Sequence, residues 1–285
     1  MKIQIFGCES LGVRSMACRV QTASQDIFID PGVALAPKRS KRPPHPIEMD
    51  NVRTIQDQIK AALQETQMVV FTHYHGDHFP MVQPDETQLS AHDVIADLQR
   101  LPVYSKSLDG LSRNQKNRRK SLEQLVGRKF PDVDGTTTDG VTYSEAVWHG
   151  EEDTHLGKVI MVKVDEGEES FVHASDIQLL DDRAVDILCT WRPTLTFFSG
   201  PPLYILGQDQ DLLTAIQGRF ARLAEACGTV IVDHHLLRSR ESEAWFDQLT
   251  QTYTNITCAA DYMNQPRKLL EADRHLLYEQ HPVGS

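Results

Sequence analysis

The chain has 285 residues, 40% of them hydrophobic, which is enough to bury one large core or two small ones. A formal net charge of −11 argues against a protein that coats nucleic acid, because phosphate binding needs an excess of Lys and Arg. Five scattered cysteines without a C-x-x-C pair fit neither a disulfide framework nor a zinc knuckle. We find neither a signal peptide nor an apolar run that could span a membrane, so we expect a cytoplasmic protein without a membrane partner.

The N-terminal part of the chain predicts three short strands and a helix. The strands are expected at residues 3–6, about 16–21 and 26–30. A proline-rich loop follows, and its cations at 38–42 either contact an anionic substrate or belong to a solvated connector. Asp50 or Asn51 can then cap a helix whose apolar residues recur at helical spacing as far as Leu63.

The next predicted strand, residues 68–71, ends in a dense group of polar side chains. Its Val and Phe residues are typical of a buried strand, and they are followed by the pattern H-x-H-x-D-H, with His73, His75, Asp77 and His78. Imidazoles and carboxylates bind zinc-like ions at about 2.0–2.2 Å, so several must converge on one point. Gly76 lets the backbone fold back there. The pattern therefore predicts a metal site rather than a histidine-rich surface loop.

The middle of the chain predicts a short helix at 90–98 and then a strongly basic run. The stretch 113–120 carries five positive charges within eight positions, which is typical of the exposed face of a helix. The alternative is an arm that contacts a phosphate group near an active site.

Three later predicted strands also end in potential ligands. His155 competes with His149, because it too precedes a glycine-led strand at 157–164, but His149 is favoured since it directly ends an apolar run. His234 is favoured over His235 because it stands nearest to its strand, and His235 stays an alternative ligand or a neighbour that transfers protons. The strands and their polar ends are 141–148 with His149, 170–174 with Asp176, and 229–233 with His234 and His235.

The remaining elements alternate between helix and strand, which indicates an α/β protein. Helices are expected at 179–188, 208–227, 241–251 and about 266–280, and strands at 195–199 and 256–259.

The H-x-H-x-D-H sequence at 73–78 resembles the metal-binding signature of the metallo-β-lactamase superfamily of hydrolases. The stretches 10–16, 30–32, 199–204 and 233–238 resemble a mostly archaeal branch of that superfamily. The resemblance implies an α/β fold of four layers, an αβ/βα sandwich in which helices flank two mixed sheets. Because such a core needs the whole chain, a single domain over residues 1–285 is expected, with a helical insert at about 90–130.

The superfamily's motifs correspond to seven ligand positions in this chain. By resemblance, one metal is held by His73, His75 and His149, the second by Asp77, His78 and His234, and Asp176 bridges the two. Asp30 matches an aspartate that supports the site from behind, where a carboxylate can hold a ligand histidine in one tautomer. Five imidazoles and two carboxylates without a thiolate suit two divalent ions, Zn first, with Mn or Fe as alternatives.

Two such ions can share a water, lower its pKa and stabilise the charge that develops on a substrate. We therefore expect a hydrolase in which a metal-bridging hydroxide attacks a small or short anionic substrate, with Asp77 and His235 as catalytic residues. The basic stretches and the charge of the metals favour a phosphodiester, whereas the net charge does not favour nucleic acid. The alternatives are a thioester or lactone hydrolase, a di-iron redox enzyme and a non-catalytic metal-binding protein.

Overall fold

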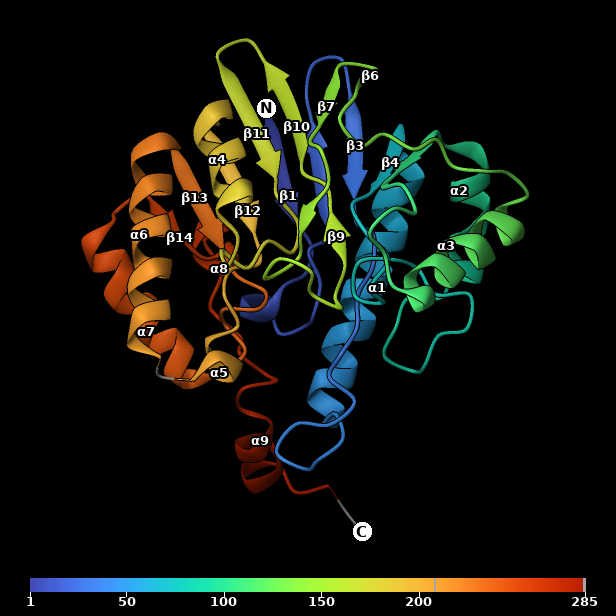
Figure 1. Ribbon diagram of the computed structural model, residues 1–285. Coiled ribbons are helices and arrows are strands. Elements are labelled where there is room, and N and C mark those ends of the chain that lie inside the picture. Colours follow the sequence, from blue (N-terminus) through green and yellow to red (C-terminus); the bar gives the residue numbers. More distant parts are fainter. Residues whose placement is uncertain (208, 284–285) are drawn as a thin grey trace.

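The computed structural model describes residues 1–207 and 209–283, and most of its strands form two large sheets (Figure 1). In the first sheet, β1 to β3 are antiparallel and β3 to β5 are parallel. Its strands, in spatial order, are β1 (Lys2–Ile5), β2 (Cys18–Gln21), β3 (Asp26–Ile29), β4 (Met68–Phe71) and β5 (Val103–Ser105).

The second sheet is also mixed, because β11 to β14 run parallel while β6, β7 and β10 pair antiparallel. In spatial order it contains β14 (Ile256–Thr257), β13 (Thr229–Val232), β12 (Leu195–Phe198), β11 (Glu169–His173), β10 (Val162–Glu166), β7 (Val141–Tyr143) and β6 (Thr137–Thr138). A separate hairpin joins β8 (Val147–Trp148) to β9 (Lys158–Val159). The strands expected at 141–148 and 157–164 are thus each divided in two, and the hairpin so formed carries His149 at its bend.

Helices cover the outer face of each sheet (Figure 1). Beside the first sheet lie α1 (Pro46–Glu65), α2 (Ile95–Arg100) and α3 (Arg113–Val126), and beside the second lie α4 (Asp182–Trp191), α6 (Gln210–Ala226) and α7 (Arg240–Thr252). Shorter helices are η1 (Glu9–Leu11), η2 (Ala91–Asp93), α5 (Leu203–Leu206), α8 (Ala259–Tyr262) and α9 (Arg274–Gln280). Among the described residues, none of the helices has the length and apolar character needed to cross a membrane.

Strand β4 shows why the two sheets and their helices form four layers. All four of its residues are buried, as expected for a strand covered on both faces. Because successive side chains point to opposite faces, Val70 packs in the core between the sheets, while Val69 and Phe71 pack in a second core under α1. The predicted αβ/βα sandwich with two mixed sheets is therefore confirmed, whereas the assignment of the chain to one domain with a helical insert stays a prediction.

The starts of α1 and α9 differ from those that the sequence predicted. Helix α1 begins at Pro46, because the ring of His45 accepts from the Ile47 amide at 3.2 Å and Glu48 accepts from the His45 amide at 2.8 Å. The helix expected from 266 begins only at Arg274, since the preceding segment crosses the N-terminal turn, where the Lys268 amide donates to the Ser10 carbonyl. Gln208, the expected start of α6, lies outside the described residues.

The ion pair between Arg274 and Glu48 holds α9 against α1, and both side chains are fully buried. We expect Arg274→Ala to lower the free energy of unfolding by about 3–5 kcal/mol, because the carboxylate of Glu48 would stay buried without its partner. Arg53→Ala is the matched control on α1, since Arg53 is 62% exposed, and it should change stability by no more than about 0.5 kcal/mol. Urea denaturation measures both, and equal effects would show that the buried pair does not hold α9.

Candidate metal centre

The predicted ligands lie together because β4, β11 and β13 end at the same edge of the two packed sheets, and the β8–β9 hairpin brings His149 to them. Strands β11, β12 and β13 are parallel, so polar residues that follow them meet at their carboxyl ends. The structure brings all seven residues to this edge: His73, His75, Asp77 and His78 after β4, His149 after β8, Asp176 after β11 and His234 after β13.

One group of donor atoms comes from His73, His75, His149 and Asp176, whose ligand atoms lie within 4.8 Å of one another. His149 Nε2 is 2.9 Å and His73 Nε2 is 3.5 Å from the same carboxylate oxygen, Asp176 Oδ2. His73 Nε2 and His75 Nδ1 are 3.1 Å apart. These nitrogen and oxygen atoms are the types and spacings that a divalent cation takes.

A second group comes from Asp77, His78 and His234, and it faces the other oxygen of the same carboxylate. Asp176 Oδ1 lies 3.2 Å from His78 Nε2 and 3.7 Å from His234 Nε2. His234 Nε2 is also 3.4 Å from Asp77 Oδ2. The two oxygens of Asp176 are therefore divided between the two groups, as a bridging ligand requires.

Two buried atoms at this edge lack a hydrogen-bond partner among the described residues, namely His78 Nε2 and Asp176 Oδ1. Leaving such atoms buried and unpaired is costly, so sites of this kind need an explanation such as an ion. A divalent cation between them would satisfy both at once. The residues present therefore fit the divalent metal that the sequence predicted.

Asp30 lies directly behind His78, on the side of the ring away from the second donor group. Its Oδ2 is 2.9 Å from His78 Nδ1, which leaves Nε2 directed toward the second group, and its Oδ1 accepts from the Thr72 amide at 2.7 Å. The turn after Asp30 passes very close to the end of the segment 73–78. A Cβ on Gly32 would lie 2.1 Å from the Phe79 amide nitrogen. Only glycine allows this approach, which explains the Asp-Pro-Gly sequence.

Glu9 supports His234 in the same way, although sequence reasoning did not identify it. Its Oε2 lies 2.6 Å from His234 Nδ1, and its Oε1 accepts from Arg238 Nε at 2.5 Å. Glu9 is 3% exposed, and the pair with Arg238 accounts for this burial, because glutamates are rarely buried without a charged partner. No sequence signal links it to His234, because 225 positions separate the two residues.

The structure also places the two histidines that competed for ligand positions. His155 is exposed at the rim and belongs to none of the donor groups among the described residues. His235 is buried, with Nδ1 3.0 Å from the Gln178 amide and Nε2 3.5 Å from Asp176 Oδ2. It joins a donor group only with Asp176 and His234, away from Asp77 and His78. This placement favours His149 and His234, while the ligand assignment itself stays a prediction.

Burial decides the charge of several of these side chains. Burial and the neighbouring His78 lower the pKa of His73 to about 4, and burial holds the pKa of His235 well below its ordinary value. Burial opposes ionisation of Asp176, yet the surrounding histidines, first of all His78, hold its pKa well below its usual value. Burial opposes protonation of His78, yet Asp176 and Asp30 hold its pKa well above the ordinary value, so a metal would have to displace a proton there, because it binds the neutral imidazole.

The donor groups open into a cavity of about 870 Å³, which is lined by His75, Asp77, His149, Asp176 and His235 among others. Neither basic stretch lines it directly. Arg39, from 38–42, reaches it only through the Arg238 carbonyl, to which it donates at 2.6 Å. In 113–120, Arg119 is buried in ion pairs with Glu123 and Asp132, and Arg118 donates to the Tyr74 carbonyl.

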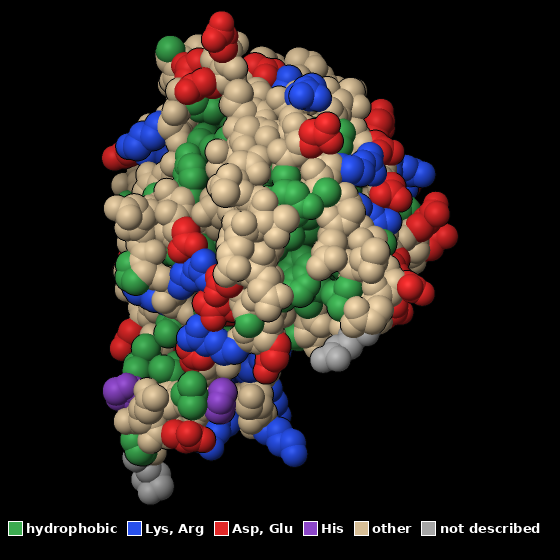
Figure 2. Space-filling model, turned by 90° about the vertical axis from the view of Figure 1, so that its left-hand side faces the viewer, with side chains coloured by type: hydrophobic (Ala, Val, Ile, Leu, Met, Phe, Trp, Pro, Cys, Tyr) green, Lys and Arg blue, Asp and Glu red, His purple; other side chains and the backbone are tan. Residues whose placement is uncertain are grey.

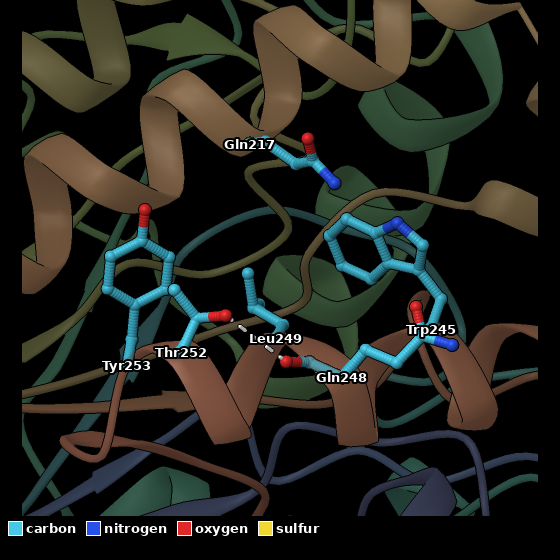
Figure 3. Close-up of a pocket in the computed structure, with 6 residues that line it drawn as sticks. All are labelled: Gln217, Trp245, Gln248, Leu249, Thr252 and Tyr253. Carbon is cyan, nitrogen blue, oxygen red and sulfur yellow. Dashed lines mark hydrogen bonds between the residues drawn. The ribbon is translucent and has the colours of Figure 1, made fainter.

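Another hollow lies between α6 and α7, on the face that Figure 2 turns toward the viewer. Figure 2 shows green apolar side chains between polar ones on this face. The hollow is lined by Trp245, Leu249 and Tyr253 with neutral polar neighbours, and Figure 3 shows these side chains at its rim. Because it contains no imidazole or carboxylate among its lining residues, it is unsuited to metal chemistry.

The four-layer fold is the metallo-β-lactamase fold. A solved isothiocyanate hydrolase from gut bacteria of Delia radicum superposes with a TM-score of 0.52, at 16% identity, over 92% of this chain and 97% of that one. At such low identity the likeness concerns the fold alone.

No family model matches the sequence. A UPF0282 protein of Methanosarcina mazei is 42% identical over 284 residues, which cover 99% of this chain and 93% of the relative. A UPF0282 protein of Thermococcus gammatolerans is 33% identical, with 98% of this chain and 95% of the relative covered. The chain therefore belongs to the UPF0282 family, and the predicted resemblance to a mostly archaeal branch of the superfamily is confirmed.

Glu9→Gln tests the support that the structure gives to His234. The amide keeps the shape of the side chain but removes the charge that fixes the ring, so we expect the metal affinity to fall about 10–100-fold. Glu65→Gln is the matched control, because Glu65 is 73% exposed and lies in the pair with Arg19. Competition with a chromophoric chelator measures the affinity, and an unchanged affinity in folded Glu9→Gln would contradict the assigned role.

Proposed function

We propose that this chain is a metal-dependent hydrolase that acts on a small anionic substrate, in first place a phosphodiester. The observation that carries the proposal is the division of the Asp176 oxygens between two buried donor groups at the floor of a cavity. The chain is proposed to hold two divalent ions there, Zn in first place and Mn or Fe as alternatives, since the donors are imidazoles and carboxylates without a thiolate.

Divalent ions in such a site supply Lewis acidity and make water a nucleophile at neutral pH. The side chains around this site position the attacking water and the substrate. Asp77 is 17% exposed and lines the cavity, so its carboxylate can accept a hydrogen bond from the attacking water and orient it. Five of the other proposed ligands are buried, which excludes bulk water and strengthens each electrostatic interaction between them: His73, His78, His149, Asp176 and His234.

His235 is proposed to be a catalytic hydrogen-bond donor at the substrate side of the site. It lines the cavity, and its Nδ1 is held by Gln178 at 3.0 Å, which leaves Nε2 directed toward Asp176 and the open space. Burial holds its pKa well below the ordinary value, so the ring is neutral at neutral pH, and its Nε2–H can donate a hydrogen bond to a substrate oxygen. Gln178 also contacts His149 Nδ1 at 3.2 Å, and it therefore orients both rings.

The anionic substrate is supported by two arginines, Arg14 and Arg238, that line the same cavity. The second candidate is a thioester or lactone hydrolase, because the same donors polarise a carbonyl oxygen as well as a phosphoryl oxygen. Chromogenic phosphodiesters, thioesters and lactones, assayed with one metal-loaded preparation, distinguish the two. Iron at both sites with an oxygen-dependent colour change would instead support the redox alternative.

Asp176→Ala tests the hydrolase. We expect turnover to fall by at least about 100-fold, since this carboxylate touches both donor groups and its loss costs more than that of an outer supporting residue. Asp181→Ala is the control, because Asp181 caps α4 outside the donor groups. Turnover that persists in Asp176→Ala, or a lack of turnover by the metal-loaded native protein on the whole substrate panel, would contradict the proposal.

Metal removal should also lower thermal stability. A ligand that binds only the folded protein, at about 1,000 times its Kd, stabilises it by about 4 kcal/mol. We therefore expect chelation to lower the Tm of the native protein and to leave the Tm of Asp176→Ala almost unchanged. Differential scanning calorimetry measures both, and equal shifts in the two proteins would place the stabilising metal elsewhere.

A further inference from the structure

Two arginines from opposite ends of the chain, Arg14 and Arg238, line the cavity beside the donor groups. Arg14 Nε and Nη2 donate to the two oxygens of Glu271, each at 2.7 Å. Arg238 Nε donates to Glu9 at 2.5 Å. Both carboxylates are at least nine-tenths buried, so the guanidinium groups are fixed in place before any substrate enters.

Each guanidinium has N–H groups left for a ligand. An arginine offers five N–H donors in a rigid fork, and the bonds to Glu271 occupy one edge of the Arg14 fork. Arg238 Nη1 has only a long contact, 3.4 Å, with the Tyr204 hydroxyl. The remaining donors can therefore bind an anionic group in the cavity that both side chains line.

The position of Arg238 Nη2 gives the strongest indication. It lies 3.0 Å from His234 Nε2 and 3.9 Å from Asp77 Oδ2, so it points into the second donor group. When His234 Nε2 serves a metal, its lone pair is no longer available to the guanidinium. Glu9 pairs with the guanidinium at its Nε, so Nη2 can then donate to an anionic group of the substrate beside the second donor group.

The cavity as a whole is not cationic, since Glu151, Glu152 and Asp153 line it too. The Arg and Lys side chains among its lining residues are those of Arg14 and Arg238. Arg39 adds a third positive charge next to Arg238. Its guanidinium lies 5.0 Å from the centre of the Tyr204 ring and donates to the Arg238 carbonyl.

We propose that Arg14 and Arg238 bind a second anionic oxygen group of the substrate, a carboxylate or phosphate close to the bond that is cleaved. This inference rests on the proposed function, because it names a feature of the substrate of that same site. The substrate is then a small molecule with two negatively charged groups, one at the metal donors and one at the arginines. Arg14 and Arg238 act as specificity-determining residues rather than as proton donors.

Two probes of equal chain length test the inference on the metal-loaded protein. Propylphosphonate carries one anionic group, and 3-phosphonopropionate carries a carboxylate in addition. We expect the native protein to bind 3-phosphonopropionate about tenfold more tightly, because a charge-assisted hydrogen bond to the carboxylate is gained. Isothermal titration calorimetry measures both dissociation constants without any turnover.

In Arg14→Gln and Arg238→Gln the preference should fall below about twofold, since the second carboxylate loses its partner. Arg113→Gln removes the same charge from the exposed start of α3 and should keep the preference. Arg238→Gln loses the buried pair with Glu9 and could unfold, which thermal melts would show. In that case Arg14→Gln alone decides the test. A native protein without the preference, or a preference that both folded arginine variants retain, would overturn the inference.

Hydrolysis assays on the same preparations separate the two proposals. A preference for 3-phosphonopropionate that depends on the arginines, without turnover on any substrate, would support the anion site and contradict the hydrolase. Turnover by a native protein that does not prefer 3-phosphonopropionate would support the hydrolase and contradict the anion site.

Discussion

The carboxylate of Asp176 is the group on which the arrangement of this protein depends. It is 1% exposed, and its two oxygens face donor atoms that come from three other strand ends. An ionised carboxylate in such a place is stable only where partners surround it, since transfer of an unpaired charge from water to a protein interior is very costly. The strands must therefore end at one edge, and the two sheets must be packed, before the site exists.

The histidines of the donor groups also need buried partners of their own. Asp30 fixes His78 and Glu9 fixes His234, each through the ring nitrogen that does not face the donor groups. Thr72 connects the two sheets. Its amide donates to Asp30, and its hydroxyl lies 2.6 Å from the hydroxyl of Ser175, which follows β11 of the second sheet. The donor groups are thus positioned by a buried hydrogen-bond network that crosses between the two sheets.

Local signals predicted the fold class and the donor groups, and non-local contacts explain what was missed. The four residues of 73–78 and the polar ends of three strands are readable because each depends on a short stretch. Glu9 and Gln178 are ordinary residues whose importance arises from contacts with His234, His235 and His149. Likewise, the start of α1 was predicted too late because His45, an unusual cap, does what Asp50 or Asn51 was expected to do.

The C-terminal segment shows why binding at this site and folding of the whole chain are coupled. After α8 it crosses the N-terminal half, where Lys268 bonds to Ser10 and Glu271 holds Arg14 from behind. Arg274 then pairs with Glu48 on α1. The C-terminal segment therefore supports the cavity wall through Glu271, which fixes the lining residue Arg14. Because the unfolded chain has no such site, any ligand that binds there adds its free energy of binding to the packing of both halves.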